Sequence, residues 1–140
     1  MEHIQADHWL KVDMKVWPWA NFTPKEVASK GNGAVYIEIE AMNKLQALRD
    51  IVGKPLIINS AYRDPAYNRK VGGANRSQHL EGRAFDIALR GHDPHALLAA
   101  AKAVGFRAFG KYRTFLHVDN RERPAAWAAR DNGTRFVWSK

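Results

Sequence analysis

Residues 77–86, SQHLEGRAFD, end in a short apolar stretch that predicts a strand at residues 84–89. Successive side chains of a strand point to opposite faces of its sheet. Phe85 and Ile87 therefore share one bulky apolar face, which is suited to packing on helices. Asp86 lies on the other face between two alanines, so there is room beside its carboxylate.

The same alternation recurs in FLHVD, residues 115–119. Two aliphatic side chains point to one face, and His117 and Asp119 share the opposite face. If the two strands are neighbours, Asp86 and His117 look into one cavity. His79, from the loop before the first strand, can then complete a set of three ligands.

These three residues suit a metal ion. The chain has no cysteine, so a metal must be held by histidine and carboxylate, which favours zinc. Two imidazoles and one carboxylate leave the fourth tetrahedral position of one Zn²⁺ ion to water, as in catalytic sites. The alternative from spacing alone is a histidine in a turn and an aspartate at a solvated strand edge.

Helix signals come early in the chain, and strand signals cluster later. A capping box at residues 23–26 starts a short helix that ends near Gly31. Residues 37–52 carry an apolar face at helical spacing. Further elements are expected as a helix at 94–104, strands at 56–59, 84–89, 106–109, 115–119 and 135–139, and a loop with at most one short helix at 60–77.

This order predicts an α+β fold. We expect a small, mainly antiparallel sheet with helices packed on one face and the zinc site on the other. Residues 1–140 are expected to form one domain that acts as a monomer, with an irregular segment at residues 1–20. The five tryptophans, including Trp127, are interpreted as packing residues, and a sugar-stacking platform is the alternative for those near the N-terminus.

Composition narrows the class of partner. Hydrophobic residues make up 46% and charged residues 26% of the 140, which is typical of a globular domain. No apolar run is long enough to span a membrane, and the N-terminus lacks a secretory signal, so we expect synthesis in the cytoplasm. The net charge of +8 favours polyanions such as nucleic acid or a bacterial wall, or is a solvated surface. No nucleic-acid-binding motif is evident, so we expect no nucleic-acid partner.

Three blocks of sequence resemble the M15 peptidases, the zinc D-Ala-D-Ala carboxypeptidases and their peptidoglycan endopeptidase relatives. SQHLEGRAFD is similar to the family motif S-x-H-x-x-G-x-A-x-D. INSAYRDPAYN, upstream, resembles S-x-Y-R-x-P-x-x-N, and RTFLHVD resembles the closing H-x-D strand. The resemblance covers residues 22–119 and is closest to the small single-domain branch common in phages and prophages. Hedgehog-like domains and the lysostaphin group share this metal site.

Carried over by position, the resemblance implies that His79, Asp86 and His117 are the zinc ligands. Arg63 matches an arginine that binds substrate in relatives, where it can hold a carboxylate or the oxyanion by a forked hydrogen bond. The alternative is a structural arginine that pairs with Asp64 or with a backbone carbonyl. Ser77 is expected at the substrate-binding site, where it orders the loop of His79 and is no nucleophile.

One position departs from the family pattern. Several relatives carry a carboxylate as general base three residues before the last histidine ligand, and here that residue is Thr114. Asp119 is the replacement that we expect to be catalytic, because it shares a strand face with His117. It could equally orient a ligand, since the two lie about 6 to 7 Å apart along the strand. Glu81 is a weaker candidate.

The resemblance implies a zinc metallopeptidase. It would hydrolyse a peptide bond in peptidoglycan stem peptides that contain D-amino acids, as a carboxypeptidase or an endopeptidase, by zinc-activated water. The cell wall is the expected place of action, in phage lysis, on a virion or in wall remodelling. The alternative is a non-catalytic, zinc-containing peptidoglycan-binding protein, which Thr114 favours.

Overall fold

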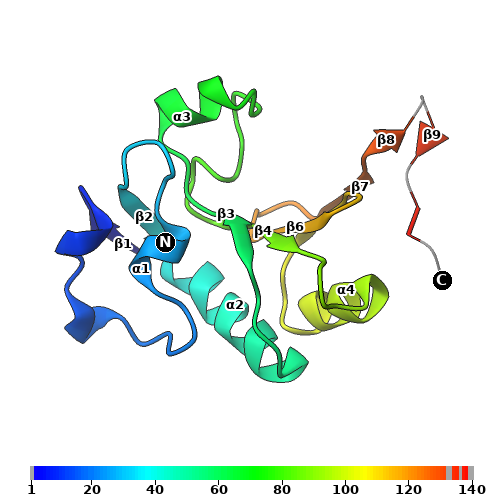
Figure 1. The fold of residues 1–140 in the computed structure, drawn as a ribbon, viewed down its shortest axis with the longest axis horizontal. Helices are drawn as coiled ribbons and strands as arrows, with labels where there is room; N and C mark the ends of the chain where they lie inside the picture. The colour runs from blue at the N-terminus through cyan, green and yellow to red at the C-terminus, as the bar shows by residue number, and fades with distance from the viewer. Residues whose placement is uncertain (1, 132–133, 136, 139–140) are drawn as a thin grey trace.

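The computed structural model describes residues 2–131, 134–135 and 137–138 (Figure 1). Helices and strands alternate along most of the chain. The helices are α1 (Pro24–Val27), α2 (Ile39–Val52), α3 (Pro65–Lys70) and α4 (Pro94–Ala103), with short 3₁₀ turns at Trp9–Lys11 and Met14–Val16. The strands are β1 (His3–Ala6), β2 (Val35–Glu38), β3 (Ile58–Ser60), β4 (Ala84–Ala88), β5 (Ala108–Lys111), β6 (Phe115–Asp119), β7 (Ala125–Ala128), β8 (Arg130–Asp131) and β9 (Thr134–Arg135).

The main sheet has five strands in the order β3-β4-β6-β5-β7. Its strands pair antiparallel except for β5 and β7, which run parallel. Two small antiparallel pairs, β1-β2 and β8-β9, lie outside it. The α+β fold with a mainly antiparallel sheet, expected from the sequence, is therefore confirmed.

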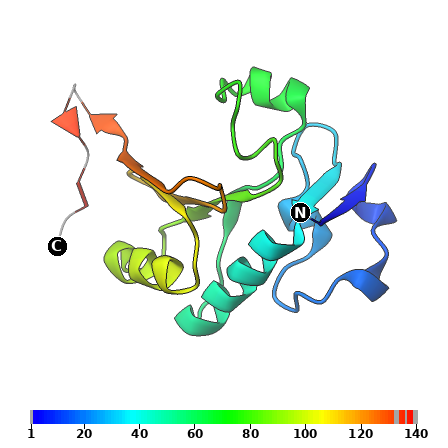
Figure 2. The ribbon, with the colours of Figure 1, turned by 180° about the vertical axis from the view of Figure 1, so that it is seen from behind.

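The helices are divided between the two sides of this sheet. In Figures 1 and 2, α2 and α4 lie below the sheet, and α3 lies on its other side. Thr23 starts α1 with the expected capping box, in which its side chain accepts the Glu26 N–H. Asp64 and Asp93 cap α3 and α4 with their carboxylates. No helix in the described ranges has the length and apolar character needed to cross a membrane.

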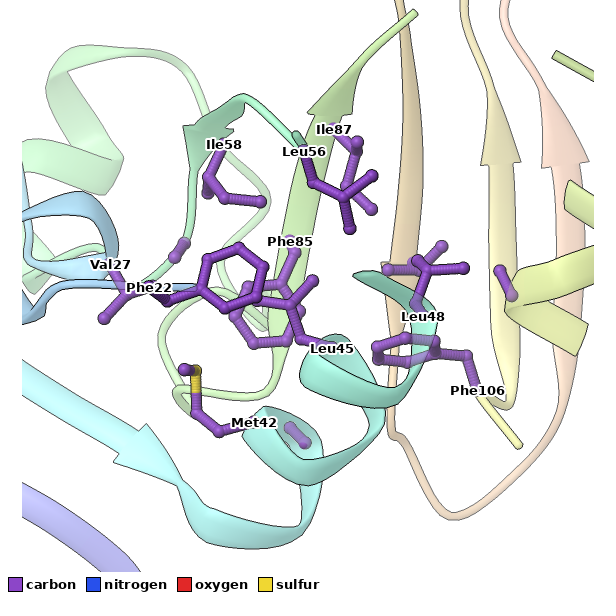
Figure 3. Packing of buried hydrophobic residues seen from close by; sticks show 14 of the residues in the cluster. Phe22, Val27, Met42, Leu45, Leu48, Leu56, Ile58, Phe85, Ile87 and Phe106 are labelled. Atoms are coloured by element: carbon purple, nitrogen blue, oxygen red, sulfur yellow. The ribbon is translucent and has the colours of Figure 1, made fainter. Parts of the chain in front are cut away.

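The hydrophobic core lies between β4 and α2. Phe85 and Ile87 of β4 are fully buried and face Leu45 and Leu48 of α2, with Phe106 beside them (Figure 3). Burial of each such side chain stabilises the fold by about 1.5–3 kcal/mol. This packing fixes which face of β4 is internal, and so directs the intervening Asp86 to the opposite side.

The N-terminal segment differs from the irregular coil that was expected for residues 1–20. His3–Ala6 forms β1, which pairs with β2 in the register Ile4 to Ile37. Residues 37 and 38 also differ from expectation, because they belong to β2 and not to the helix that follows. Pairing with a distant strand stabilises both segments, and neither has a local sequence signal strong enough to predict it.

Element boundaries otherwise differ by only a few residues. Helix α1 ends at Val27, well before Gly31, and β3 and β5 begin two residues later than expected. The single short helix allowed at residues 60–77 is α3. The strand expected at 135–139 falls partly on residues outside the described part of the chain. Of its described positions, Arg135 belongs to β9, and 137 and 138 form no strand.

Candidate metal centre

The pairing of β4 with β6 places Asp86 directly opposite His117. Cross-strand partners on one face of an antiparallel pair have side chains in contact. His79 joins them from the loop before β4, which is tied to the chain before α3 because the Arg63 N–H donates to the His79 carbonyl at 3.2 Å. One potential ligand atom from each of the three residues lies within 4.8 Å of the others, and all three are buried.

Hydrogen bonds fix how both imidazoles face the carboxylate. The Nδ1–H of His79 donates to the Ala61 carbonyl at 2.6 Å, which leaves Nε2 facing the Asp86 Oδ1 at 3.2 Å. The Nε2–H of His117 donates to the Asp119 Oδ2 at 2.7 Å, which leaves Nδ1 facing the same Oδ1 at 2.9 Å. When both imidazoles are neutral in these tautomers, their lone pairs face one anionic oxygen, an arrangement that a cation between them stabilises.

The donor set and its spacing fit zinc. Donor atoms about 2.1 Å from a tetrahedral zinc lie about 3.4 Å from one another, close to the distances between each imidazole and Asp86. Two nitrogens and one oxygen are also the donor types that borderline divalent ions prefer. His79, Asp86 and His117 therefore form a cluster that fits a zinc site.

Asp86 and Asp119 both have carboxyl groups that stay ionised. Burial raises the pKa of Asp86, but hydrogen bonds with His117 and His79 outweigh this effect and hold it well below its usual range. Burial likewise raises the pKa of Asp119, and hydrogen bonds with Arg121 and His117 lower it to about 2. Each carboxylate keeps its charge near neutral pH, where a metal ligand and its supporting group need it.

Asp119 is enclosed by its partners. It is 0% exposed, and the Arg121 guanidinium donates from Nε to Oδ1 at 2.9 Å and from Nη2 to Oδ2 at 2.7 Å. The Arg121 backbone N–H donates to Oδ1 at 3.1 Å. Asp86 and Asp119 thus contact different nitrogens of the same imidazole of His117, and Asp119 lies on the side away from the cluster.

Arg63 lies in contact with the cluster. Its Nη2 donates to the Asp86 Oδ2 at 3.4 Å, and its Nε donates to the Ser60 hydroxyl at 3.1 Å. Asn68 accepts from its Nη1 at 3.3 Å. Ser77 accepts the His79 backbone N–H on its hydroxyl at 3.2 Å, within the loop of that residue.

The cluster lines one side of an open cavity of about 440 Å³. Arg63 and Ser77 also line it, and among its described lining residues Asp86 supplies the only carboxylate. Glu81, the weaker base candidate, and Thr114, which occupies the position of the family's base, are exposed and do not line this cavity.

The side chains of the cavity that were not predicted from the sequence include Tyr112, Arg121 and Trp127. Arg121 had a possible signal, because it lies two residues beyond Asp119 and could continue the same strand face. Trp127 was interpreted as a packing residue, and it in fact stands 5.1 Å from the His117 ring. It reaches the cavity because β7 pairs in parallel with β5, a pairing that has no local sequence signal.

Comparison with known proteins agrees with this site. A family model described as Peptidase M15 matches residues 20–119, more than half of the chain. The zinc D-Ala-D-Ala carboxypeptidase of Streptomyces albus G is 34% identical over 89 residues, which are 63% of this chain. The chain spans about a third of the length of that relative, 33%. All three cluster residues lie within the matched range.

Proposed function

The chain belongs to the M15 peptidase family, and from this premise we propose that it is a zinc metallopeptidase that hydrolyses peptidoglycan stem peptides. The observation that carries the proposal is the convergence of His79, Asp86 and His117 at the wall of an open cavity. A buried three-ligand set beside a cavity is typical of catalytic zinc sites, in which one coordination position stays open. The relative's name, a zinc D-Ala-D-Ala carboxypeptidase, supports a substrate with D-amino acids.

We propose His79 Nε2, a carboxylate oxygen of Asp86 and His117 Nδ1 as the ligand atoms. Their other polar atoms have protein partners, which holds each donor in position. When bound, zinc supplies a Lewis acid that polarises the scissile carbonyl and lowers the pKa of a water molecule.

Arg63 is proposed as a substrate-binding and catalytic residue. Ser60 and Asn68 hold its guanidinium at the edge of the cluster, and its contact with Asp86 is the longest of the three, at 3.4 Å. An arginine so placed can donate a forked hydrogen bond to a carboxylate or carbonyl oxygen of the substrate. Ser77, at the same cavity, is proposed to bind substrate and to keep the His79 loop in place.

Asp119 could act as the general base or could orient His117, and its surroundings favour the orienting role. A general base must reach the proton that it abstracts. The Asp119 carboxylate has no exposed surface, and its oxygens accept hydrogen bonds from His117 and Arg121. We propose that it orients His117 and raises the basicity of that ligand, as carboxylates behind metal-bound imidazoles do.

One observation favours a second candidate function. The described wall of the cavity offers no carboxylate besides Asp86 that could serve as base. A protein that binds zinc and peptidoglycan without cleaving it is therefore the alternative. For either function we propose that the protein acts on the cell wall in phage lysis, on a virion or in wall remodelling. We also propose that it is a monomer.

The test is mass spectrometry of the fragments that the protein releases from purified peptidoglycan. We expect the zinc-loaded protein to release peptide or D-alanine, and the masses identify the bond. Chelation or His79→Ala should abolish release, and zinc should restore it only to the chelated wild type. Release that persists without metal would contradict the proposal. Zinc and wall binding without any release would establish the alternative.

A further inference from the structure

Tyr112 places a fixed hydroxyl group in the wall of the metal cavity. It follows β5 directly, and its ring stacks on Phe115 with 4.3 Å between centroids and 8° between planes. The Trp127 Nε1–H donates to the Tyr112 hydroxyl oxygen at 2.9 Å. A phenol that accepts one hydrogen bond still has its own O–H to donate. The oxygen is thus held in place while its proton is available.

Trp127 is itself held by contacts with three residues. Its indole lies over the backbone of Gly110, where an added Cβ would come within 2.5 Å of the ring. The ring stands 5.1 Å from the imidazole of His117, and the Arg121 guanidinium lies 5.1 Å from its centroid. The indole therefore links a proposed zinc ligand to the Tyr112 hydroxyl through direct contacts.

Such a donor accelerates the hydrolysis of a peptide bond. Negative charge develops on the carbonyl oxygen as water attacks, and preorganised donors aimed at that oxygen lower the barrier. Arg63 donates to Ser60, Asn68 and Asp86, which leaves two of its five N–H groups for the substrate. Among the described residues, the Tyr112 hydroxyl is hydrogen-bonded to the Trp127 N–H, which is a donor and therefore does not use the phenol O–H.

We infer that Tyr112 is a further catalytic residue, whose hydroxyl donates a hydrogen bond to the scissile carbonyl oxygen, and that Trp127 is the positioning residue that aims it. The inference rests on the proposed peptidase function. No bond to the phenol forms or breaks, and its proton stays on its oxygen. The hydroxyl acts by a hydrogen bond that strengthens as the charge develops.

The kinetic test uses variants that keep the aromatic rings. Tyr112→Phe should lower kcat by about 10²–10³-fold with little change in KM, as for the loss of one oxyanion donor. Trp127→Phe, which removes the N–H, should lower kcat by a smaller factor. Tyr67→Phe is the matched control, because Tyr67 lies on α3 and is not part of the cavity wall. It should leave both constants unchanged.

A binding measurement separates this role from a structural one. Calorimetry with a phosphinate analogue of D-alanyl-D-alanine probes the charge of the transition state, and D-alanine probes the ground state. In Tyr112→Phe, affinity for the phosphinate should fall by the factor lost in kcat/KM, whereas affinity for D-alanine and the zinc content should stay unchanged.

Two results overturn the inference alone: an active wild type with an equally active Tyr112→Phe protein, or equal losses of affinity for the phosphinate and D-alanine. A wild type that releases nothing from peptidoglycan overturns the proposed function, and the inference falls with it.

Discussion

The Oδ2 of Asp119 lies 2.7 Å from the Nε2 of His117, and this contact sets which nitrogen of the imidazole can meet a metal. A carboxylate in this position fixes the tautomer and the ring orientation of a ligand. Asp119→Asn should therefore lower zinc affinity about 10–100-fold, as loss of such partners does. Competition with a chromogenic zinc chelator measures the change.

The control for this substitution is Asp50→Asn, which removes the same charge from an exposed position on α2. It should leave zinc affinity unchanged. If Asp119→Asn binds zinc as tightly as the wild type, Asp119 does not support His117. A loss of zinc-independent stability would instead show that its contact with Arg121 mainly holds the fold.

Zinc should also stabilise the fold. A ligand that binds only the folded chain adds about 2.7 kcal/mol at a concentration 100 times its Kd. We expect thermal unfolding of the wild type to shift upward by several degrees on adding zinc, because about 1 kcal/mol moves Tm by a few degrees in a domain of this size. His79→Ala should lose the shift, and His92→Ala, outside the cluster, should keep it. An equal shift in all three proteins would mean that zinc binds elsewhere.

The elements that form the site were predictable because their sequence signals are local. Strict alternation at 84–88 and 115–119 predicted both strands and the shared face of Asp86 and His117. Caps predicted where helices begin, as at Thr23 and Asp93. The β1-β2 pair was not predictable, since its partners are about 30 residues apart and neither strand alternates clearly.

In the cavity, too, the residues set by local sequence patterns were predicted, and those set by contacts between distant segments were not. The ligand positions follow from strand alternation and from the family motif, which lie within short stretches. The wall formed by Tyr112 and Trp127 depends on the parallel pairing of β5 with β7. Likewise, the enclosure of Asp119 by Arg121 depends on how the chain leaves β6, which the alternation within the strand does not specify.

Gly110 should be intolerant of any side chain, because the indole of Trp127 occupies the space. A Cβ at this position would come within 2.5 Å of ring atoms. Gly110→Ala should destabilise the protein by about 1–3 kcal/mol, as overpacking does, and should lower peptidase activity by displacing the indole. Denaturant unfolding measures the first effect.

A double-mutant cycle tests the cause. In a Trp127→Ala background, Gly110→Ala should cost less, because the three atoms nearest to its Cβ belong to the indole that is removed. The same cost in both backgrounds would show that the glycine is needed for another reason, such as its backbone conformation.

The carboxylate of Asp64 should make stability depend on pH. Burial raises the pKa of Asp64. Hydrogen bonds from the Ser29 hydroxyl and from the backbone N–H groups of Tyr67 and Asn32 outweigh this effect, so the pKa lies below 3.8. A lowered folded-state pKa adds stability that is fully present above the unfolded value of about 3.9 and is lost as the pH falls through the folded value. The loop that carries Arg63 depends on these contacts.

Asp64→Asn keeps a residue able to cap α3 but removes the charge. Its free energy of unfolding should be lower than that of the wild type by about 1 kcal/mol near pH 7. The difference should begin to shrink as the pH falls below about 4, where Asp64 of the unfolded chain takes up its proton, and should vanish once the pH passes the lowered pKa of the folded state. Ser29→Ala, which removes a donor to the same carboxylate, should reduce the pH dependence in the same direction. Urea unfolding from pH 2 to 7 measures both, and a difference that stays constant over this range would contradict the assignment to Asp64.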